Sequence, residues 1–292
     1  MSAKFLENFG SKLAEQWVAT LLTPAFVFWL GGVAAFLQRF GWKSASSWFG
    51  QQPQPLQIAL LVGGFCLIAA SGFVVQRFDL PVLRFLEGYW HPLLRSLRRW
   101  FIARETKRSQ QISDRWQQLL QIDPAQLTVE ERNELVQLDW QQIYFPLPNQ
   151  IMPTRLGNIL HAAEQRPLEK YGLDAVICWS RLWLLLPDAV KKDLQEARAD
   201  LNTAARVWLW SLLFIIWTIW AWWAAPVGII SSIFAYYYWA LEAATTYGEL
   251  VEAAFDLHRH LLYQSLRWGL PADPKEERRV GKELTEYLWR GR

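Results

Sequence analysis

The most regular arrangement of ionisable side chains lies between Gly228 and Trp268, in a stretch that starts apolar and becomes polar. At about 100° per residue, a helix here aligns its polar side chains along one narrow face. We call this face the carboxylate ridge, and its members are Glu242, Thr245, Glu249, Glu252, Asp256, His260, Tyr263 and Arg267. Leucines and alanines occupy the other side of the same helix. The pattern predicts a surface that attracts cations.

Three residues of the ridge have a spacing suited to a metal ion. Glu252, Asp256 and His260 follow one another at intervals of four residues, so one helical face presents two carboxylates and an imidazole. The same spacing arises on any solvated helix face, and no second segment offers an obvious matching ligand set. His161 and Glu164, three residues apart, come nearest. A metal site and a solvated face are therefore both open interpretations.

Glu242 is a candidate because of its expected depth in a membrane. It lies about 16 residues along the helix, hence roughly 24 Å from the outer end and still within the inner leaflet. An ionisable group at that depth is expected to have a function, such as lining an ion or proton pathway. The alternative is a structural ion pair, because Arg206 on the preceding helix falls within about one turn of Glu242 or Glu249.

The ridge requires a membrane scaffold, and four apolar runs supply it. Three of them, Trp17–Gln38, Leu56–Gln76 and Val207–Ala225, are uncharged and long enough to cross about 30 Å of hydrocarbon. The fourth starts at Gly228. Because Ala225–Gly228 leaves room only for a tight turn, the last two runs should form an antiparallel hairpin. The expected fold is all-α with four transmembrane helices and a helical cytoplasmic region between spans two and three.

Basic residues set the expected orientation. After the second span they arrive with few acids among them: Arg77, Arg84, Arg95, Arg98, Arg99, Arg104, Lys107 and Arg108. The linker between the first two spans holds only Arg39 and Lys43, so the positive-inside rule places both termini in the cytoplasm. We expect three parts. Residues 1–76 hold an amphipathic amino-terminal helix and two spans, residues 77–205 the cytoplasmic or interfacial helices, and residues 206–292 the hairpin with its cytoplasmic extension and tail.

Arginines provide the candidate anion sites. Arg95, Arg98 and Arg99 lie among leucines and aromatic residues at helical spacing, which is typical of a basic amphipathic helix on anionic lipid. The alternative is a helix packed on the cytoplasmic part with its arginines in solvent. Arg155 follows Thr154 at a helix entry, where backbone NH groups could receive a phosphate. It could equally hold its loop to the carboxylate ridge.

Composition excludes several classes of function. The formal charge of +3 is too small to indicate nucleic-acid binding, and the two cysteines show neither disulfide nor metal spacing. The apolar residues, with 19 tryptophans among them, gather into long runs as in a membrane bundle. No phosphate-binding loop, hydrolase or metalloprotease motif occurs. We therefore expect no cofactor, and an enzymatic function is disfavoured.

Three segments resemble known sequences. Residues 127–140, 152–183 and 247–271 are similar to segments of uncharacterised multi-span membrane proteins of bacteria. The resemblance covers a minority of the chain. It implies a bacterial inner-membrane protein and carries no activity, cofactor or site residue.

These observations leave three functional hypotheses. The first is an oligomeric cation-conducting channel or transport component lined by the carboxylate ridge. The second is a membrane-anchored scaffold or regulator that binds a protein partner or anionic lipid. The third is a metal-dependent membrane enzyme. The expected partners are the lipid bilayer, anionic lipid and either further copies of the chain or another protein.

Overall fold

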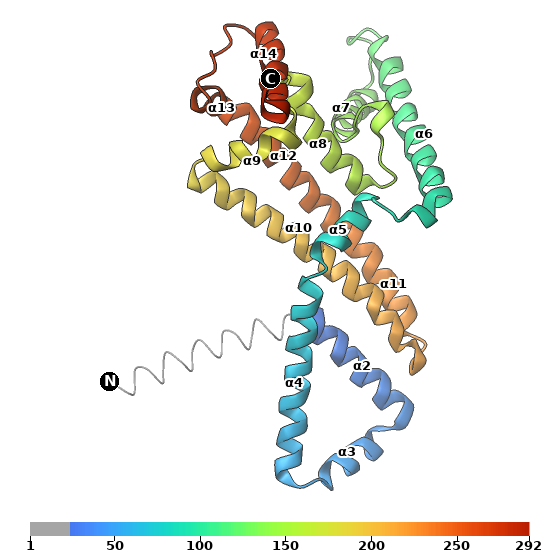
Figure 1. Cartoon of the computed structure of the whole chain (residues 1–292). Helices are drawn as coiled ribbons and strands as arrows, with labels where there is room; N and C mark the ends of the chain where they lie inside the picture. The colour runs from blue at the N-terminus through green and yellow to red at the C-terminus, as the bar shows by residue number, and fades with distance from the viewer. Residues whose placement is uncertain (1–23, 292) are drawn as a thin grey trace. The chain divides into compact units, whose positions relative to one another are not determined.

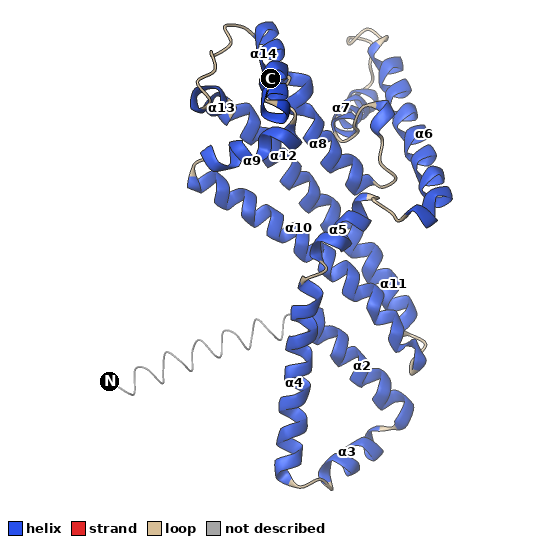
Figure 2. Cartoon of the chain, viewed as in Figure 1, coloured by secondary structure: helices blue, strands red, loops and turns tan. Residues whose placement is uncertain are grey.

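The computed structural model describes residues 24–291, and within this range the chain forms helices, turns and loops but no strand (Figures 1 and 2). The all-α prediction is confirmed. In chain order the elements are α2 (Pro24–Phe40), α3 (Trp42–Gly50), α4 (Gln54–Gln76), α5 (Asp79–Glu87), η1 (Pro92–Leu94), α6 (Arg95–Leu120), α7 (Val129–Ile143), η2 (Pro148–Gln150), α8 (Arg155–Tyr171), α9 (Ala175–Leu185), α10 (Asp188–Phe214), η3 (Ile215–Ile219), α11 (Ala224–Phe234), the π-helical segment η4 (Ala235–Ala240), α12 (Leu241–His258), α13 (His260–Ser265) and α14 (Pro274–Arg290). The expected amino-terminal surface helix and the start of the first span lie outside the described residues.

Three helices are long and apolar enough to cross a membrane: Gln54–Gln76, Asp188–Ile219 and Ala224–His258. Their length and composition identify a membrane protein. Helices α2 and α3 meet this criterion only as a pair, and they are bent by 105° where they join. The expected count of four spans is thus not confirmed. The segment between the first two predicted spans was expected to be a linker, but it forms the short helix α3, which the count of spans includes only together with α2.

The turn of the last hairpin lies earlier than predicted. It occupies residues 220–223, whereas Ala225–Gly228 belongs to α11. Pro226 is tolerated there because the backbone NH groups in the first turn of a helix need no helical partner. Gly228 then allows close packing on α10, since a Cβ at this position would lie 2.7 Å from the Ser211 carbonyl oxygen.

The described chain divides into two compact units. The first contains the residues up to Val82 together with Asn202–Tyr238, and the second contains Leu83–Leu201 and Trp239–Arg292. Aromatic side chains hold the first unit together. Phe28 packs against Trp210 and Trp217, and the Trp217 indole donates a 3.0 Å hydrogen bond to the Phe28 carbonyl oxygen. Trp29 likewise donates to the Ser71 hydroxyl at 3.1 Å.

One hydrophobic core of the second unit lies among α9, α10, α12, α13 and α14. Its most buried members are Leu173, Cys178, Leu182, Leu194, Phe255, Leu262, Tyr263 and Leu284. Helix α8 lies beside α12 (Figure 1), and a Cβ on Gly248 would be 3.1 Å from the Ala163 side chain. This close approach brings the side chains of α8 and α12 into direct contact.

Helix boundaries in the second unit agree with the sequence in part. Thr128 and Glu131 have the spacing that predicts a capping box, and this box opens α7. The Arg166-Pro167 pair predicts a break between two short helices, but this prediction is wrong, because α8 continues through Pro167 and is capped by Gly172, whose φ of 74° suits glycine. Pro81 lies in the first turn of α5, where a proline is tolerated, and the chain turns at Arg77-Phe78 before this helix and at Gly88 after it.

The close approach of α14 to α8 generates a stability prediction. A Cβ at Gly281 would lie 2.0 Å from the Tyr171 carbonyl oxygen. We expect Gly281→Ala to lower the free energy of unfolding by about 1–3 kcal/mol, since backbone must move to admit the methyl group. Thermal unfolding in detergent measures the change. Gly269→Ala is the control, because a Cβ there meets nothing within 4 Å. Equal melting temperatures for the two variants would contradict the close packing.

Candidate functional site

The carboxylate ridge of α12 is paired with cations of α8. Arg166 forms an ion pair with Glu252. Lys170 lies between two carboxylates, with its Nζ 2.7 Å from Glu252 Oε1 and 3.0 Å from Asp256 Oδ2. The spacing of four residues repeats on both helices, so adjacent helical turns of α8 and α12 meet charge against charge. The ridge thus joins two helices of one unit.

Tyrosines complete the pairing. The Tyr171 hydroxyl donates to Asp256 Oδ1 at 2.7 Å, and the Tyr144 hydroxyl donates to Glu249 Oε1 at 3.2 Å. Burial and the neighbouring carboxylate raise the pKa of each phenol, so both stay protonated and keep donating. Burial opposes the charge of Lys170, but its bonds with Glu252 and Asp256 outweigh this effect and raise its pKa.

The network extends to α14 through one arginine. The Arg259 guanidinium lies 3.9 Å from the centre of the Tyr171 ring, and its Nε is 2.6 Å from Glu277 Oε1. Tyr171 therefore contacts a carboxylate through its hydroxyl and a cation through its ring face. Three helices, α8, α12 and α14, are linked by this set of contacts.

The predicted metal ligands Glu252, Asp256 and His260 are not gathered around one point. Among residues 24–291, no three His, Cys, Asp or Glu side chains are grouped so that they could hold an ion. Glu252 and Asp256 already bind cations of α8, and His260 is exposed at the start of α13, two residues beyond the end of α12. His161 and Glu164 approach each other at 3.5 Å. The geometry does not support the metal-site hypothesis.

The ion pair predicted for Arg206 has a different partner. Arg206 Nε lies 3.0 Å from Asp79 Oδ1, whereas the expected partners were Glu242 and Glu249. Asp79 is the first acidic residue after the second span and opens α5. Its position beside a span end was a usable signal that the sequence reasoning missed. Glu242 is exposed within the helix Ala224–His258.

The candidate anion sites differ in their surroundings. Arg95 and Arg99 are exposed at the start of α6, and Arg98 donates from Nε to the Gly88 carbonyl oxygen at 3.4 Å. Arg155 is half-buried and lines a cavity of about 160 Å³ with Glu105 and other residues of α6, α7 and α8. Carboxylate and guanidinium groups thus share the wall of this cavity.

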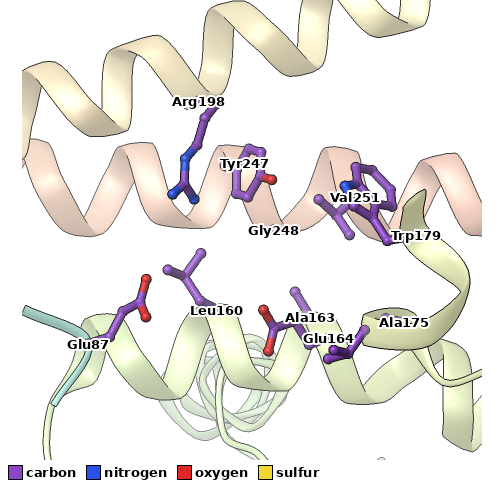
Figure 3. Close-up of a pocket in the computed structure, with 11 residues that line it drawn as sticks. Glu87, Leu160, Ala163, Glu164, Ala175, Trp179, Arg198, Tyr247, Gly248 and Val251 are labelled. Carbon is purple, nitrogen blue, oxygen red and sulfur yellow. The ribbon is translucent and has the colours of Figure 1, made fainter. Parts of the chain in front are cut away.

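A larger cavity of about 270 Å³ lies within the second unit (Figure 3). Its walls come from α5, α8, α9, α10 and α12, and they are formed by Glu87, Leu160, Ala163, Glu164, Ala175, Val176, Trp179, Arg198, Tyr247, Gly248 and Val251. Figure 3 shows Glu87 and Arg198 at one end and Trp179 with Ala175 at the other. The cavity therefore combines a charged end with an apolar end.

The charged end holds the Glu87 carboxylate and the Arg198 guanidinium, while the Glu164 carboxylate lies farther along the wall beside Ala163 (Figure 3). Burial raises the pKa of Glu87; Arg198 acts against this effect and Glu164 adds to it. The Arg198 guanidinium lies 5.4 Å from the centre of the Tyr247 ring. Of these residues, only Glu164 belongs to a pattern that is visible in the sequence, through its spacing from His161. The others are separated by up to 160 positions, so only the folded chain brings them together.

Comparison of the chain with protein-family models, curated proteins and solved structures finds no match. The resemblance to multi-span membrane proteins of bacteria stays a prediction. The features that point to a function are the paired carboxylate ridge, the cavity of about 270 Å³ and the exposed arginines of α6.

The pairing of the ridge makes a further stability prediction. We expect Arg166→Met to lower the free energy of unfolding by about 1–3 kcal/mol, because Glu252 loses a charged hydrogen-bond partner in a site that is largely shielded from solvent. Lys192→Met is the matched control. Its pair with Glu196 spans 3.7 Å on the surface, and such pairs contribute about 0–1 kcal/mol. Thermal unfolding of both variants in detergent measures how much stability each one loses. A loss no larger for Arg166→Met than for Lys192→Met would show that the ridge is not structural.

Proposed function

We propose that the protein is a membrane-anchored scaffold or regulator of the bacterial inner membrane, with both termini in the cytoplasm. In this proposal its second unit binds anionic lipid through the start of α6. One observation carries the proposal. Exposed apolar side chains and exposed arginines occur together in the eight residues 93–100.

The apolar side chains of this segment lack cover within the described chain. Leu93 is 88% exposed, Leu97 46% and Trp100 60%. Exposed leucines and a tryptophan on one short segment are typical of a helix that rests in the headgroup region of a bilayer. The exposed Arg95 and Arg99 supply the charge complementary to anionic headgroups, worth about 1 kcal/mol for each basic residue near the surface.

The connection to the membrane also favours lipid over other surfaces. Helix α4, a candidate span, ends at Gln76, and Leu93 follows only 17 residues later (93 minus 76). A segment tethered so close to a span end meets the bilayer at a high effective concentration. Modest intrinsic affinity then suffices for stable docking.

The state of the carboxylate ridge favours a scaffold over conduction. Glu252 and Asp256 bind Lys170 of the same unit, and Glu249 accepts a hydrogen bond from Tyr144. Carboxylates that are already paired attract a passing cation less strongly than free ones. Their role in this proposal is to hold α8 on α12.

Lipid docking is tested with a dye at the apolar tip of the segment. Leu93→Cys in a Cys66→Ser background is labelled with an environment-sensitive fluorophore. Cys178 remains unlabelled because burial raises its pKa to about 11. We expect blue-shifted emission in nanodiscs that contain phosphatidylglycerol, and solvent-like emission after Arg95→Gln with Arg99→Gln.

The control removes the same charge elsewhere in the second unit. Lys192→Gln with Lys275→Gln changes two exposed cations of α10 and α14 and should leave the blue shift intact. Raised salt should weaken docking in the parent protein, since exposed charges are screened. Identical emission in anionic and in purely zwitterionic nanodiscs would refute the proposal.

A second candidate function rests on Glu242. This carboxylate is exposed on a candidate span and lies two residues after the end of the π-helical segment Ala235–Ala240. π-helical turns are rare and frequent at functional sites, and a carboxylate in a membrane is costly unless it is used. In an oligomer, Glu242 would line a cation path without help from the paired residues of the ridge.

Cation flux into liposomes tests this second candidate. If Glu242 lines a path, Glu242→Gln should slow flux about tenfold, because the charge that attracts the ion is lost. Glu286→Gln, an exposed residue of α14, is the control and should leave the rate unchanged. Parent protein that passes no cation under any gradient would rule out conduction and leave the scaffold proposal in place.

A further inference from the structure

Charged side chains are arranged differently on the two sides of the α8–α12 pair, which we call the ridge side and the cavity side. On the ridge side, acids and bases meet at 2.7 and 3.0 Å. On the cavity side, Arg198 forms no ion pair within 4.0 Å with Glu87 or Glu164, or with any other acid of the described chain. The guanidinium lies instead over the Tyr247 ring. Charged groups of both signs therefore line one hollow without neutralising each other.

The hollow has room for a small molecule. Its volume of about 270 Å³ is slightly below the range of roughly 300–1,000 Å³ that accommodates drug-sized molecules. Val176 is 76% exposed and Glu164 is also exposed, so the wall is open to solvent beside them. The apolar lining of Trp179, Val251 and Leu160 offers a surface that water fills poorly.

The charges of the wall select the sign of the ligand. The groups that line the wall are two carboxylates and one guanidinium, an excess of one negative charge; Arg84 acts on Glu87 from outside the lining, and His161 beside Glu164 adds a positive charge only when protonated. Burial disfavours the charged form of Glu87 despite the nearby Arg198 and Arg84. A cation placed beside Glu87 and Glu164 would relieve this imbalance, whereas an anion would increase it.

We infer that this cavity binds a small organic ammonium ion that carries a short apolar body. The ammonium group donates hydrogen bonds to Glu87 and Glu164, and the apolar body packs against Trp179 and Val251. Arg198 is held on Tyr247 and does not contact the ligand; its charge limits how strongly the cation is bound. This site is separate from the lipid-docking segment, so failure of either proposal leaves the other standing.

Titration calorimetry of the full-length protein in a neutral detergent tests the inference. The probe is 2-phenylethylammonium, and 2-phenylethanol is its uncharged counterpart. We expect the ammonium to bind at least about tenfold more tightly, because only it can pair with the carboxylates. Equal affinities for the two compounds, or no saturable binding of the ammonium, would overturn the inference.

Variants locate the binding site. Glu87→Gln should weaken ammonium binding about tenfold or more, and Trp179→Leu should weaken both compounds. Glu169→Gln changes an exposed acid of α8 outside the cavity and should leave affinity within about twofold. If Glu87→Gln fails to give a parent-like melting curve, Glu164→Gln tests the same charge. Loss of affinity in the Glu169 variant equal to that in the cavity variants would also overturn the inference.

Arg198 separates an ammonium site from a site for a zwitterion. Removing its like charge by Arg198→Gln should strengthen ammonium binding about twofold or more. Phenylalanine, which adds a carboxylate to the probe, should bind the parent more weakly than 2-phenylethylammonium. Tighter binding of phenylalanine, lost in Arg198→Gln, would show that Arg198 binds a carboxylate and would contradict the proposed ligand class.

Discussion

The second unit depends on the contact between Lys170 of α8 and the two carboxylates Glu252 and Asp256 of α12. These acids repel each other one helical turn apart, and neither could approach an apolar helix without losing hydration. Lys170 reduces both the repulsion between the two acids and the energy lost when they leave water, because it forms an ion pair with each of them. With the repulsion cancelled, Gly248 lets the backbones approach until Ala163 is in contact range. Charge pairing and small residues thus act together to set the distance between the two helices.

The same distance determines the cavity. Leu160 and Ala163 of α8 and Tyr247 and Val251 of α12 face each other on the side away from Lys170. Because small residues lie at the closest approach, the larger ones to either side do not fill the gap completely. Trp179 of α9 closes one end. A structural ion network and a ligand-sized hollow are consequences of one helix packing.

Local features could be predicted from the sequence, and long-range partners could not. The capping box at Thr128 and the uninterrupted span near Gln76 depend on neighbouring residues, and both are found in the structure. Pro226 and Pro167 both resemble helix breakers, yet each lies within a helix. Pro226 is in the first turn of α11, where its missing NH group has no helical partner to lose. Pro167 lies deeper in its helix and is buried, so its place depends on the packing of α8 and not on a local pattern.

The candidate sites show the same limit more sharply. The periodicity of the ridge identified its acids, but periodicity describes one helix and says nothing about what lies opposite. Arg166 and Lys170 share that spacing on α8, and matching the two patterns would have indicated a helix pair. Glu87 and Arg198 belong to no pattern at all. Glu87 lies at the cavity because α5 ends there, and Arg198 lies at the cavity because α10 passes it. Both placements depend on the fold and not on a local sequence pattern.

The pairing of the ridge also changes what Glu242, its member nearest the start of α12, can mean. If all the acids were free, a row of them would form one continuous attractive surface, and Glu242 would be its first step. With Glu249, Glu252 and Asp256 engaged by α7 and α8, that continuity is broken within the subunit. Conduction would then have to depend on Glu242 brought close to its own copies. Anchoring requires no such arrangement, because the exposed leucines and arginines of α6 act in a single chain.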